Sequence, residues 1–359
     1  MQPARRGRII PAMTRTVHII DAAATRDCLR SIGALAGPDD LVVSVGPAPR
    51  WLPPGLNPTA VHRPMGLATL CGHRIAGLIG DVQFVLAWSE AAATAGEVVA
   101  AARSAPLLRT LASLPTGRKL SAMLNRLRPG RLVVSVPTEA ARRELVRLGA
   151  AERSVVVLRP PAPLAEMSAT RQQTRERLGL GQAEALLVAP AEMTRDSGHK
   201  YAAWIHGLLR HGGLEVKLLL PGGGPHEKHV RSFAATTGFD EELFFTGERF
   251  TLGEVLAAGD VAIFPVERDC GVGALAAAMA AGAPIVATET PDIAECAPHE
   301  EAALLVGPGD PREAAAAILR LLEDRALADR LAATARQRAE ELFDVEKCRV
   351  RLREIYASL

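Results

Sequence analysis

The sequence predicts an α/β protein made of two Rossmann-like domains that face each other across a cleft. Three observations lead to this prediction. At 359 residues the chain is long enough for about two domains. Short, continuous apolar runs alternate with segments rich in Ala, Leu and Arg at helical spacing, which is typical of a parallel sheet covered on both faces. The second half of the chain then repeats this alternation, so two such arrays follow one another.

The first array is expected to be a series of strands, each followed by a helix. Its expected strands are 16–21, 41–45, 82–87, 131–137 and 155–158. Thr138 and Gly149 stand where an N-cap and a C-terminal stop belong, and they enclose one of the helices. The run 159–163 (RPPAP) is a rigid breaker and therefore the best candidate for a linker. A helix is expected after it, over 166–180, ending at Gly179.

The second array repeats the pattern around the glycine turn 221–225 (PGGGP). Its expected strands are 185–189, 216–220, 243–246, 261–265, 284–288 and 303–306, and its expected helices are 200–209, 226–237, 252–258 and 273–281, with further helices to the end of the chain. We accordingly divide the chain into a basic leader at 1–12, an N-terminal domain at 13–163, a C-terminal domain at 164–342 and a last helix at 343–359. That helix is expected to pack back on the N-terminal domain.

Charge is distributed unevenly between the halves of the chain. The overall net charge is only +2, but residues 1–165 carry 21 Lys and Arg against 10 Asp and Glu, whereas residues 166–359 carry 21 against 30. A basic half joined to an acidic half indicates two domains whose surfaces meet different partners.

Cysteine usage and the start of the chain indicate a reducing compartment. The five cysteines are scattered and have no CxxC spacing, so neither a disulfide framework nor a zinc site is expected. Residues 1–12 are basic and lack the apolar core of a signal peptide, and Met13 is an alternative start. No uncharged apolar window of about 18 residues occurs, so no transmembrane helix is expected. We therefore expect a cytoplasmic protein.

Missing motifs exclude several classes of enzyme. No GxGxxG opens a helix after a strand and no P-loop of the GxxxxGK[ST] form occurs, which excludes a dinucleotide-dependent dehydrogenase and a P-loop NTPase. No GxSxG elbow occurs, which excludes an α/β-hydrolase. The nine histidines form no HExxH and no tight cluster of ligands, so no metal cofactor is expected.

The strongest local signal lies between residues 261 and 288. There the strand VAIFP is followed by the loop VERDCGVG, the helix ALAAAMAAG and the strand PIVAT. The N–H groups of Gly271, Val272, Gly273 and Ala274 are expected to point out of the helix N-terminus, where the helix dipole favours an anion. A loop at the carboxyl end of a parallel strand is also where open α/β sheets bind ligands. The alternative is a glycine-assisted tight turn that holds no ligand.

Several stretches of the second half resemble the C-terminal domain of group 1 (family 4) glycosyltransferases of the GT-B fold. They are LLLPGGGPHEKHV, LAAGDVAIFPV, AAAMAAGAPIVATETPDIAE and AALLVGPGDPREAAAAILRLLEDRALADRLAATARQRAEELF. In the first half, TEAARRELVRLGAAERSVVVLRPPAP is similar to the end of that family's N-terminal domain. The resemblance implies two domains that clasp a nucleotide-sugar. It also implies transfer of the sugar to an acceptor with retention of anomeric configuration and without a metal.

The resemblance also implies roles for individual positions, and several of them are altered here. Asp269 falls on an acidic position of the family and is the implied catalytic residue, whereas Ala277 replaces the glutamate that holds the ribose hydroxyls of the donor. An arginine and a lysine that neutralise the donor diphosphate fall on Glu192 and Ser197. Alanine cannot accept the ribose hydrogen bonds, and a glutamate beside a diphosphate is electrostatically unfavourable.

Neighbouring residues are candidates to replace the lost groups. Arg195, His199 and Lys200 are candidates for the diphosphate, and Glu267 is a candidate for the missing carboxylate. Losing two cations and one carboxylate removes charge-assisted hydrogen bonds that are each worth on the order of 1.5–3 kcal/mol. The expected donor site therefore consists of the loop Gly271–Ala274 together with Arg195, Lys200 and Glu267.

Residues 98–138 form a basic segment that contains no acidic residue. Its arginines and lysine are interleaved with leucines at spacings of three and four, which predicts an apolar stripe with basic flanks. Such a segment can lie in a membrane interface and attract anionic lipid. The alternative is a pair of ordinary domain helices whose leucines face the core. Nucleic acid is not an expected partner, because the segment contains no aromatic residue on which bases could stack.

The function predicted from these patterns is that of a cytoplasmic glycosyltransferase, with peripheral contact at the inner membrane face. It would move a sugar from a nucleotide-sugar, held by the C-terminal domain, to a lipid-linked or polysaccharide acceptor held by the N-terminal domain. The altered donor residues motivate an alternative, a catalytically degenerate GT-B protein that serves as a binding or scaffold module. An epimerase or phosphorylase of the same fold ranks last.

Overall fold

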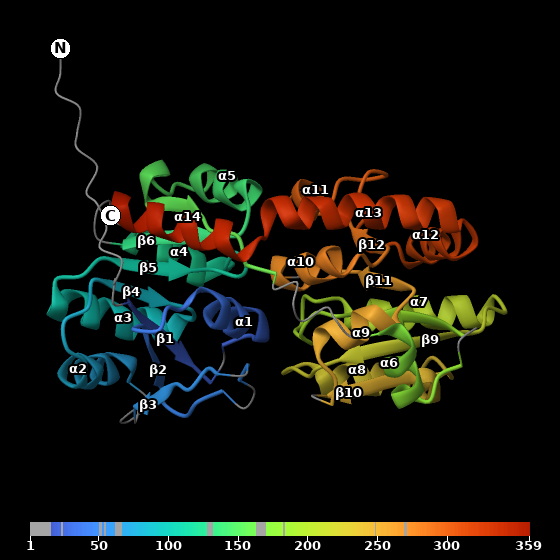
Figure 1. Cartoon of the computed structure of the whole chain (residues 1–359), viewed down its shortest axis with the longest axis horizontal. Coiled ribbons are helices and arrows are strands. Elements are labelled where there is room, and N and C mark those ends of the chain that lie inside the picture. The colour runs from blue at the N-terminus through green and yellow to red at the C-terminus, as the bar shows by residue number, and fades with distance from the viewer. Residues whose placement is uncertain are drawn as a thin grey trace, which may run out of the picture. The chain divides into compact units, whose positions relative to one another are not determined.

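Two parallel sheets organise the chain in the computed structural model (Figure 1). The structure describes residues 16–22, 24–49, 52–53, 55–61, 67–127, 132–162, 170–181, 184–247, 249–268 and 271–359. Contacts divide the chain into unit 1, which is Met1–Pro161 with Val345–Leu359, and unit 2, which is Ala162–Asp344. Each unit contains one sheet with helices on both faces, which confirms the α/β prediction.

The described part of unit 1 holds a seven-stranded parallel sheet in the order β3-β2-β1-β4-β5-β6-β7. Its strands are β1 (Thr16–Asp21), β2 (Leu41–Val45), β3 (Thr59–Val61), β4 (Phe84–Ala87), β5 (Leu107–Thr110), β6 (Leu132–Val136) and β7 (Val155–Val157). Its helices are α1 (Arg26–Leu35), α2 (Ala68–Leu78), α3 (Glu90–Arg103), α4 (Gly117–Arg126), α5 (Glu139–Arg147) and α14 (Val345–Ser358). β1 is covered on both faces, because Ile19 packs into the core on one face and Ile20 into the core on the other.

Local signals for α5 are confirmed in detail. The side chain of Thr138 accepts a hydrogen bond from the N–H of Ala141 at 3.0 Å, as an N-cap does. The helix ends at Arg147, and Gly149 follows with a φ of 104°, a conformation that glycine adopts without steric cost.

The leucine stripe expected over 98–138 is not one amphipathic segment. It comprises the end of α3, the interior strand β5, the helix α4 and the strand β6. The partly buried leucines of this region pack against a core cluster that includes Met123 and Val134; they are Leu114, Leu120, Leu124 and Leu127. The alternative that these leucines face the core is therefore the one that the structure supports.

The last helix, α14, packs within unit 1. The ring of Tyr356 stacks on Phe84 of β4 with 3.9 Å between the ring centroids. Arg351 donates from Nε to the carbonyl of Val157 at 3.2 Å, and Arg349 donates from Nε to the carbonyl of Ala34 at 2.9 Å. Side chains of α14 thus form part of the core of unit 1, together with side chains from the first 161 residues.

Unit 2 repeats this architecture with a six-stranded parallel sheet over its described residues, in the order β10-β9-β8-β11-β12-β13. Its strands are β8 (Ala185–Val188), β9 (Val216–Pro221), β10 (Leu243–Gly247), β11 (Val261–Phe264), β12 (Ile285–Thr288) and β13 (Leu304–Val306). Its helices are α6 (Arg171–Leu178), α7 (His199–His211), α8 (Glu227–Ala234), α9 (Leu252–Ala258), α10 (Val272–Ala281), α11 (Pro291–Cys296), α12 (Pro311–Glu323) and α13 (Arg325–Leu342). α9, α10 and α11 cover one face, and α7, α8 and α12 cover the other.

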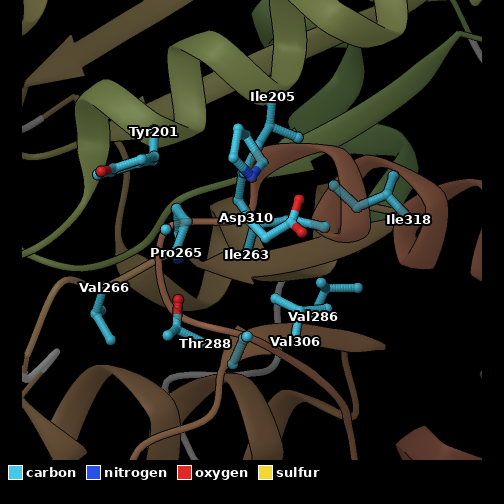
Figure 2. Close-up of a pocket in the computed structure, with 15 residues that line it drawn as sticks. Tyr201, Ile205, Ile263, Pro265, Val266, Val286, Thr288, Val306, Asp310 and Ile318 are labelled. Atoms are coloured by element: carbon cyan, nitrogen blue, oxygen red, sulfur yellow. The ribbon is translucent and has the colours of Figure 1, made fainter.

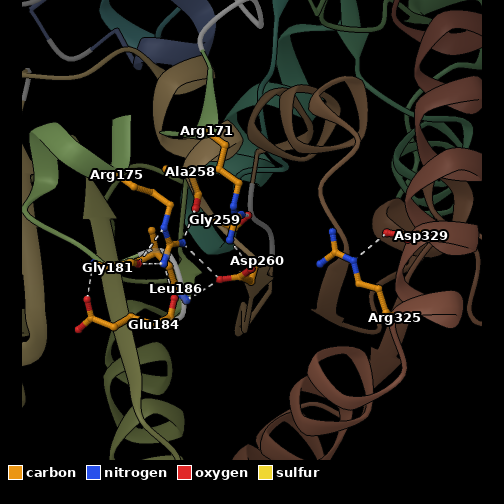
Figure 3. Close-up of polar contacts among 10 residues, drawn as sticks. All are labelled: Arg171, Arg175, Gly181, Glu184, Leu186, Ala258, Gly259, Asp260, Arg325 and Asp329. Carbon is orange, nitrogen blue, oxygen red and sulfur yellow. Dashed lines mark hydrogen bonds and ion pairs between the residues drawn. The ribbon is translucent and has the colours of Figure 1, made fainter. Parts of the chain in front are cut away.

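A buried arginine fastens α6 to the amino end of this sheet (Figure 3). The Arg175 side chain is fully buried, and one of its guanidinium nitrogens lies 3.5 Å from Oδ2 of Asp260. Asp260 also accepts from Arg171 at 2.6 Å and from the N–H of Leu186 in β8 at 2.8 Å. The Arg175 guanidinium donates further hydrogen bonds to the carbonyls of Ala258, Gly181 and Glu184.

Candidate functional site

The carboxyl ends of β8 and β11 form the switch point of the unit 2 sheet. β8 has β9 on one side and β11 on the other, so the connections that leave β8 and β11 diverge to opposite faces of the sheet. Open α/β sheets bind ligands at this point. Three connections lie at this edge: the β8 loop (189–198), the β9 turn (222–226) and the β11 loop (265–271).

Two glycines allow these three connections to touch. Gly198 has a φ of 75°, and a Cβ added to it would lie 1.8 Å from the carbonyl oxygen of Pro265. Gly224 has a φ of 158°, and its added Cβ would lie 2.4 Å from the carbonyl oxygen of Met193. Backbone hydrogen bonds hold the contacts, from Met193 N to Gly223 O at 3.0 Å, from His226 N to Met193 O at 2.9 Å and from Glu267 N to Asp196 O at 3.1 Å.

The N-terminus of α10 opens at this edge, as the sequence predicts. Gly271 has a φ of 68° and precedes the helix without a side-chain cap. The N–H groups of Val272 and Gly273 lead the helix, where no preceding helical carbonyl can reach them. The N–H of Ala274 donates to the carbonyl of Gly271 at 3.2 Å, so this donor is engaged within the turn. Asp269, the implied catalytic residue, lies outside the described residues.

The predicted cations and the predicted carboxylate gather around one histidine of the β9 turn. The pKa of His226 is lowered by burial and by the positive charges of His229, Lys200 and Arg195, whereas Glu267 raises it. These charges act on the same ring, so the three connections bring them together. Within the described ranges, neither Arg195 nor Lys200 forms an ion pair or a side-chain hydrogen bond. His226 is not among the site residues predicted from the sequence. Its position directly after the glycine turn that follows a strand could have identified it as a candidate.

His199 does not supply a positive charge here. Its side chain is buried, and burial lowers its pKa to about 4 although the carbonyls of Ala189 and Ala191 act to raise it. The ring is therefore neutral near pH 7. Its Nδ1 lies 2.7 Å from Oγ of Ser197, which also accepts from the N–H of Thr194 at 3.0 Å. The prediction that His199 replaces a lost cation is wrong, because this pair instead fastens the β8 loop to the start of α7.

Two of the three altered positions, Ala277 and Glu192, do not suit the roles that the resemblance implies. Ala277 is 6% exposed and packs among the apolar residues of α10 and its neighbours. Its methyl group offers no acceptor for a ribose hydroxyl. Glu192 is half-buried in the β8 loop, the same connection that carries Arg195. The departures read from the sequence therefore persist in the folded chain.

A small pocket lies beside the switch point, between α7, α12 and the carboxyl ends of β11, β12 and β13 (Figure 2). Its volume is about 20 Å³, enough for about one water molecule. Figure 2 shows largely apolar side chains around it, with side-chain oxygens on Tyr201, Thr288 and Asp310. Small-molecule sites occupy about 300–1,000 Å³, so this pocket cannot enclose a nucleotide.

Metal-binding clusters and membrane-spanning helices are both absent from the described residues. These residues contain no group of three His, Cys, Asp or Glu side chains placed to hold a metal ion. None of their helices is long and apolar enough to cross a membrane.

Residues 185–324 match the model of the family described as glycosyl transferases group 1. A stretch of 190 residues, 50% of this chain, is 27% identical to a 2-deoxystreptamine glucosyltransferase of Streptomyces kanamyceticus. That stretch spans 48% of the relative, so the chain matches about half the length of this curated protein.

Solved structures resemble almost the whole chain. The crystal structure of Anabaena HepE in complex with UDP and glucose matches with a TM-score of 0.82 at 16% identity, covering 97% of this chain and all of that one. Sucrose-phosphate synthase of Thermosynechococcus elongatus matches with a TM-score of 0.77 at 17% identity, covering 95% of this chain and 98% of that one. At these identities the likeness establishes the fold, which is GT-B.

Proposed function

We propose that this chain, a group 1 glycosyl transferase by its residues 185–324 and by its GT-B fold, transfers a hexose from a UDP-sugar to a hydroxyl acceptor. The observation that carries the proposal is that Arg195 and Lys200, which form no ion pair within the described residues, both act on His226 at the sheet edge where α10 also begins. Structures of HepE contain UDP, glucose and UDP-glucose, and the Streptomyces relative is named a glucosyltransferase, which supports the choice of donor.

The site has the chemistry that departure of a diphosphate requires. In the reaction, the bond between the anomeric carbon and the diphosphate oxygen breaks, and a bond from the anomeric carbon to the acceptor oxygen forms. The acceptor hydroxyl gives up its proton, and UDP leaves with the electron pair. Fixed cations and N–H donors stabilise the charge that develops on the departing oxygen. We expect retention of configuration, as in the family that the chain resembles.

Ligand binding tests this function most directly. Calorimetry and thermal shift with UDP-, GDP- and ADP-glucose are expected to show binding of UDP-glucose. Stabilisation should reach about 2.7 kcal/mol when the ligand is at a hundred times its Kd. Gly273→Leu adds a side chain beside the leading N–H groups of α10 and should abolish binding.

The matched control is Gly77→Leu, a glycine in helix α2 of unit 1 whose added Cβ would meet nothing within 4 Å. It should leave binding unchanged. Binding that survives Gly273→Leu contradicts the placement of the diphosphate at α10.

A degenerate GT-B protein that acts as a binding or scaffold module is the second candidate function. The observation that favours it is Ala277, which is buried where the family carries a ribose-binding glutamate. Under this alternative, none of the three nucleotide-sugars stabilises the chain. Release of UDP from UDP-glucose, measured with and without acceptor, then separates a binding module from an enzyme.

The proposal also covers the acceptor of the sugar and the place in the cell where the protein works. We propose that unit 1 binds the acceptor and that the acceptor is lipid-linked or a polysaccharide. We also propose that the protein works in the cytoplasm, at the inner membrane face. Contact with a membrane through 98–138 would have to be electrostatic, because the leucines of that segment pack against the core. Two of its cations also have partners on α3, since Lys119 lies 3.1 Å from Glu90 and Arg126 lies 3.6 Å from Glu97.

A further inference from the structure

The β9 turn delivers two stacked histidines to the switch point of unit 2. His226 is the residue before α8, and His229 follows one turn later on that helix. Their ring centroids are 4.5 Å apart and the ring planes differ by 17°. His226 is half-buried and His229 is exposed, so both rings are within reach of a ligand at this edge.

The position of His226 is fixed by the backbone rather than by its own side chain. Its N–H donates to the carbonyl of Met193 at 2.9 Å, and the N–H of Met193 donates back to the carbonyl of Gly223 at 3.0 Å. The close approach at Gly224 leaves no room for a side chain between the two connections. The backbone of His226 is therefore held against the β8 loop, which carries the positions where the resemblance places the family's two diphosphate-binding cations.

The charges that face His226 come from each neighbouring connection. Arg195 belongs to the β8 loop, Lys200 to the first turn of α7, His229 to α8 and Glu267 to the β11 loop. Three of these four groups carry or can carry positive charge. Burial and these positive charges together hold the pKa of His226 below its ordinary value of 6.5, so the ring is neutral near pH 7 while no anion is bound.

We propose that His226 contacts the diphosphate of the nucleotide-sugar and becomes protonated when the donor binds. The inference rests on the proposed function and adds to it a residue that replaces one of the family's missing cations. A diphosphate at this point reverses the local charge, and a nearby opposite charge favours the protonated form of an imidazole. One ring of the stacked pair takes the proton, because two positive rings 4.5 Å apart would repel each other.

Proton uptake predicts how donor affinity depends on pH. Binding raises the pKa of His226 from its lowered value in the free protein to a higher value in the complex. At any pH between these two pKa values, the free protein must gain a proton in order to bind the donor. Affinity should therefore be highest at acidic pH and fall as pH rises through this window, by up to about tenfold per pH unit for one proton.

The experiment is calorimetry of the full chain with UDP-glucose at pH 6, 7 and 8, in buffers of different ionisation enthalpy. UDP-glucose is the probe because its diphosphate has no terminal phosphate group, whereas a terminal phosphate titrates near pH 6 and would confound the measurement. The expected result is a net uptake of protons on binding. His226→Gln should abolish this uptake and weaken binding about tenfold at pH 6, as the loss of one charge-assisted hydrogen bond does.

Two further variants separate a charge effect from a structural one. His226→Lys keeps a positive charge at all three pH values, so it should retain tight binding and lose the pH dependence. His211→Gln changes a histidine at the far end of α7 and should behave as the wild type. Proton uptake that persists in His226→Gln, or affinity that His226→Gln leaves unchanged, overturns the inference. If UDP-glucose binds without any pH dependence, this inference fails alone; if no nucleotide-sugar binds, the proposed function fails with it.

Discussion

At the residue scale, Gly198 shows how a position without a side chain shapes the site. It ends the β8 loop with a φ of 75°, and the carbonyl of Pro265 occupies the space that a Cβ would need. Glycine adopts this backbone conformation without the penalty that other residues incur. The consequence is that the β8 loop and the β11 loop approach each other beside Arg195 and Glu267, where the N–H of Glu267 donates to the carbonyl of Asp196.

Gly198→Ala is expected to separate these loops. The added methyl group cannot stand 1.8 Å from an oxygen, so the backbone must shift in addition to carrying strain of about 1–3 kcal/mol. Affinity for UDP-glucose should fall at least about tenfold by calorimetry. The control is Gly213→Ala just beyond the other end of α7, where φ is 89° but nothing lies within 4 Å. If both variants bind the donor alike, the close approach at Gly198 is not what organises the site.

At the scale of elements, strand β5 shows where the spacing of apolar residues predicts the wrong secondary structure. Leu107 and Leu108 belong to a run of leucines at spacings of three and four, a pattern typical of a helix. In the structure they lie in an interior strand, with Leu107 beside Val85 on one side and Leu132 on the other. A strand buried on both faces is apolar throughout, so local pattern cannot distinguish it from part of an apolar helical stripe.

Helix α6 depends on the buried guanidinium of Arg175 rather than on an apolar stripe. Its fully buried side chain joins the helix to Asp260 and to three carbonyls at the amino end of the sheet. Arg175→Met should lower the free energy of unfolding by about 3–5 kcal/mol, because it leaves buried polar groups without their partner. Urea denaturation measures this loss.

The matched control for Arg175 is a surface pair that Figure 3 also shows. Arg325 and Asp329 lie 3.2 Å apart on α13, and both side chains are largely exposed. Arg325→Met should cost at most about 0.5 kcal/mol, as exposed pairs of this spacing do. Equal losses in the two variants would show that the Arg175 cluster is not a buried anchor.

At the scale of the whole molecule, the chain leaves unit 1 and later returns to it. It passes into unit 2 between Pro161 and Ala162, and it returns between Asp344 and Val345. The two crossing segments are joined by a hydrogen bond from the N–H of Ala162 to the carbonyl of Phe343, at 2.9 Å. Unit 1 therefore cannot complete its core until the last residues of the chain are present.

Tyr356→Ala tests this dependence on the end of the chain. The ring is 7% exposed and stacks on Phe84, so its removal should cost about 3–5 kcal/mol of unfolding free energy. Hydrogen exchange should become faster for amides in β1 and β4 and stay unchanged in β8 and β11. Val350→Ala on the same helix, 45% exposed, should change stability by less than about 0.5 kcal/mol. Faster exchange throughout unit 2 would contradict the division into two units.

The fold class and most strand positions follow from the amino-acid sequence alone. Continuous apolar runs stay out of water only when both faces of a sheet are covered, so they mark parallel strands wherever they occur. Only the tertiary structure decided the strand order, the burial of His199 and the gathering of Arg195, Lys200 and Glu267 around His226. These features depend on contacts between residues far apart in the chain, and short-range periodicity does not encode which loops meet at the edge of a sheet.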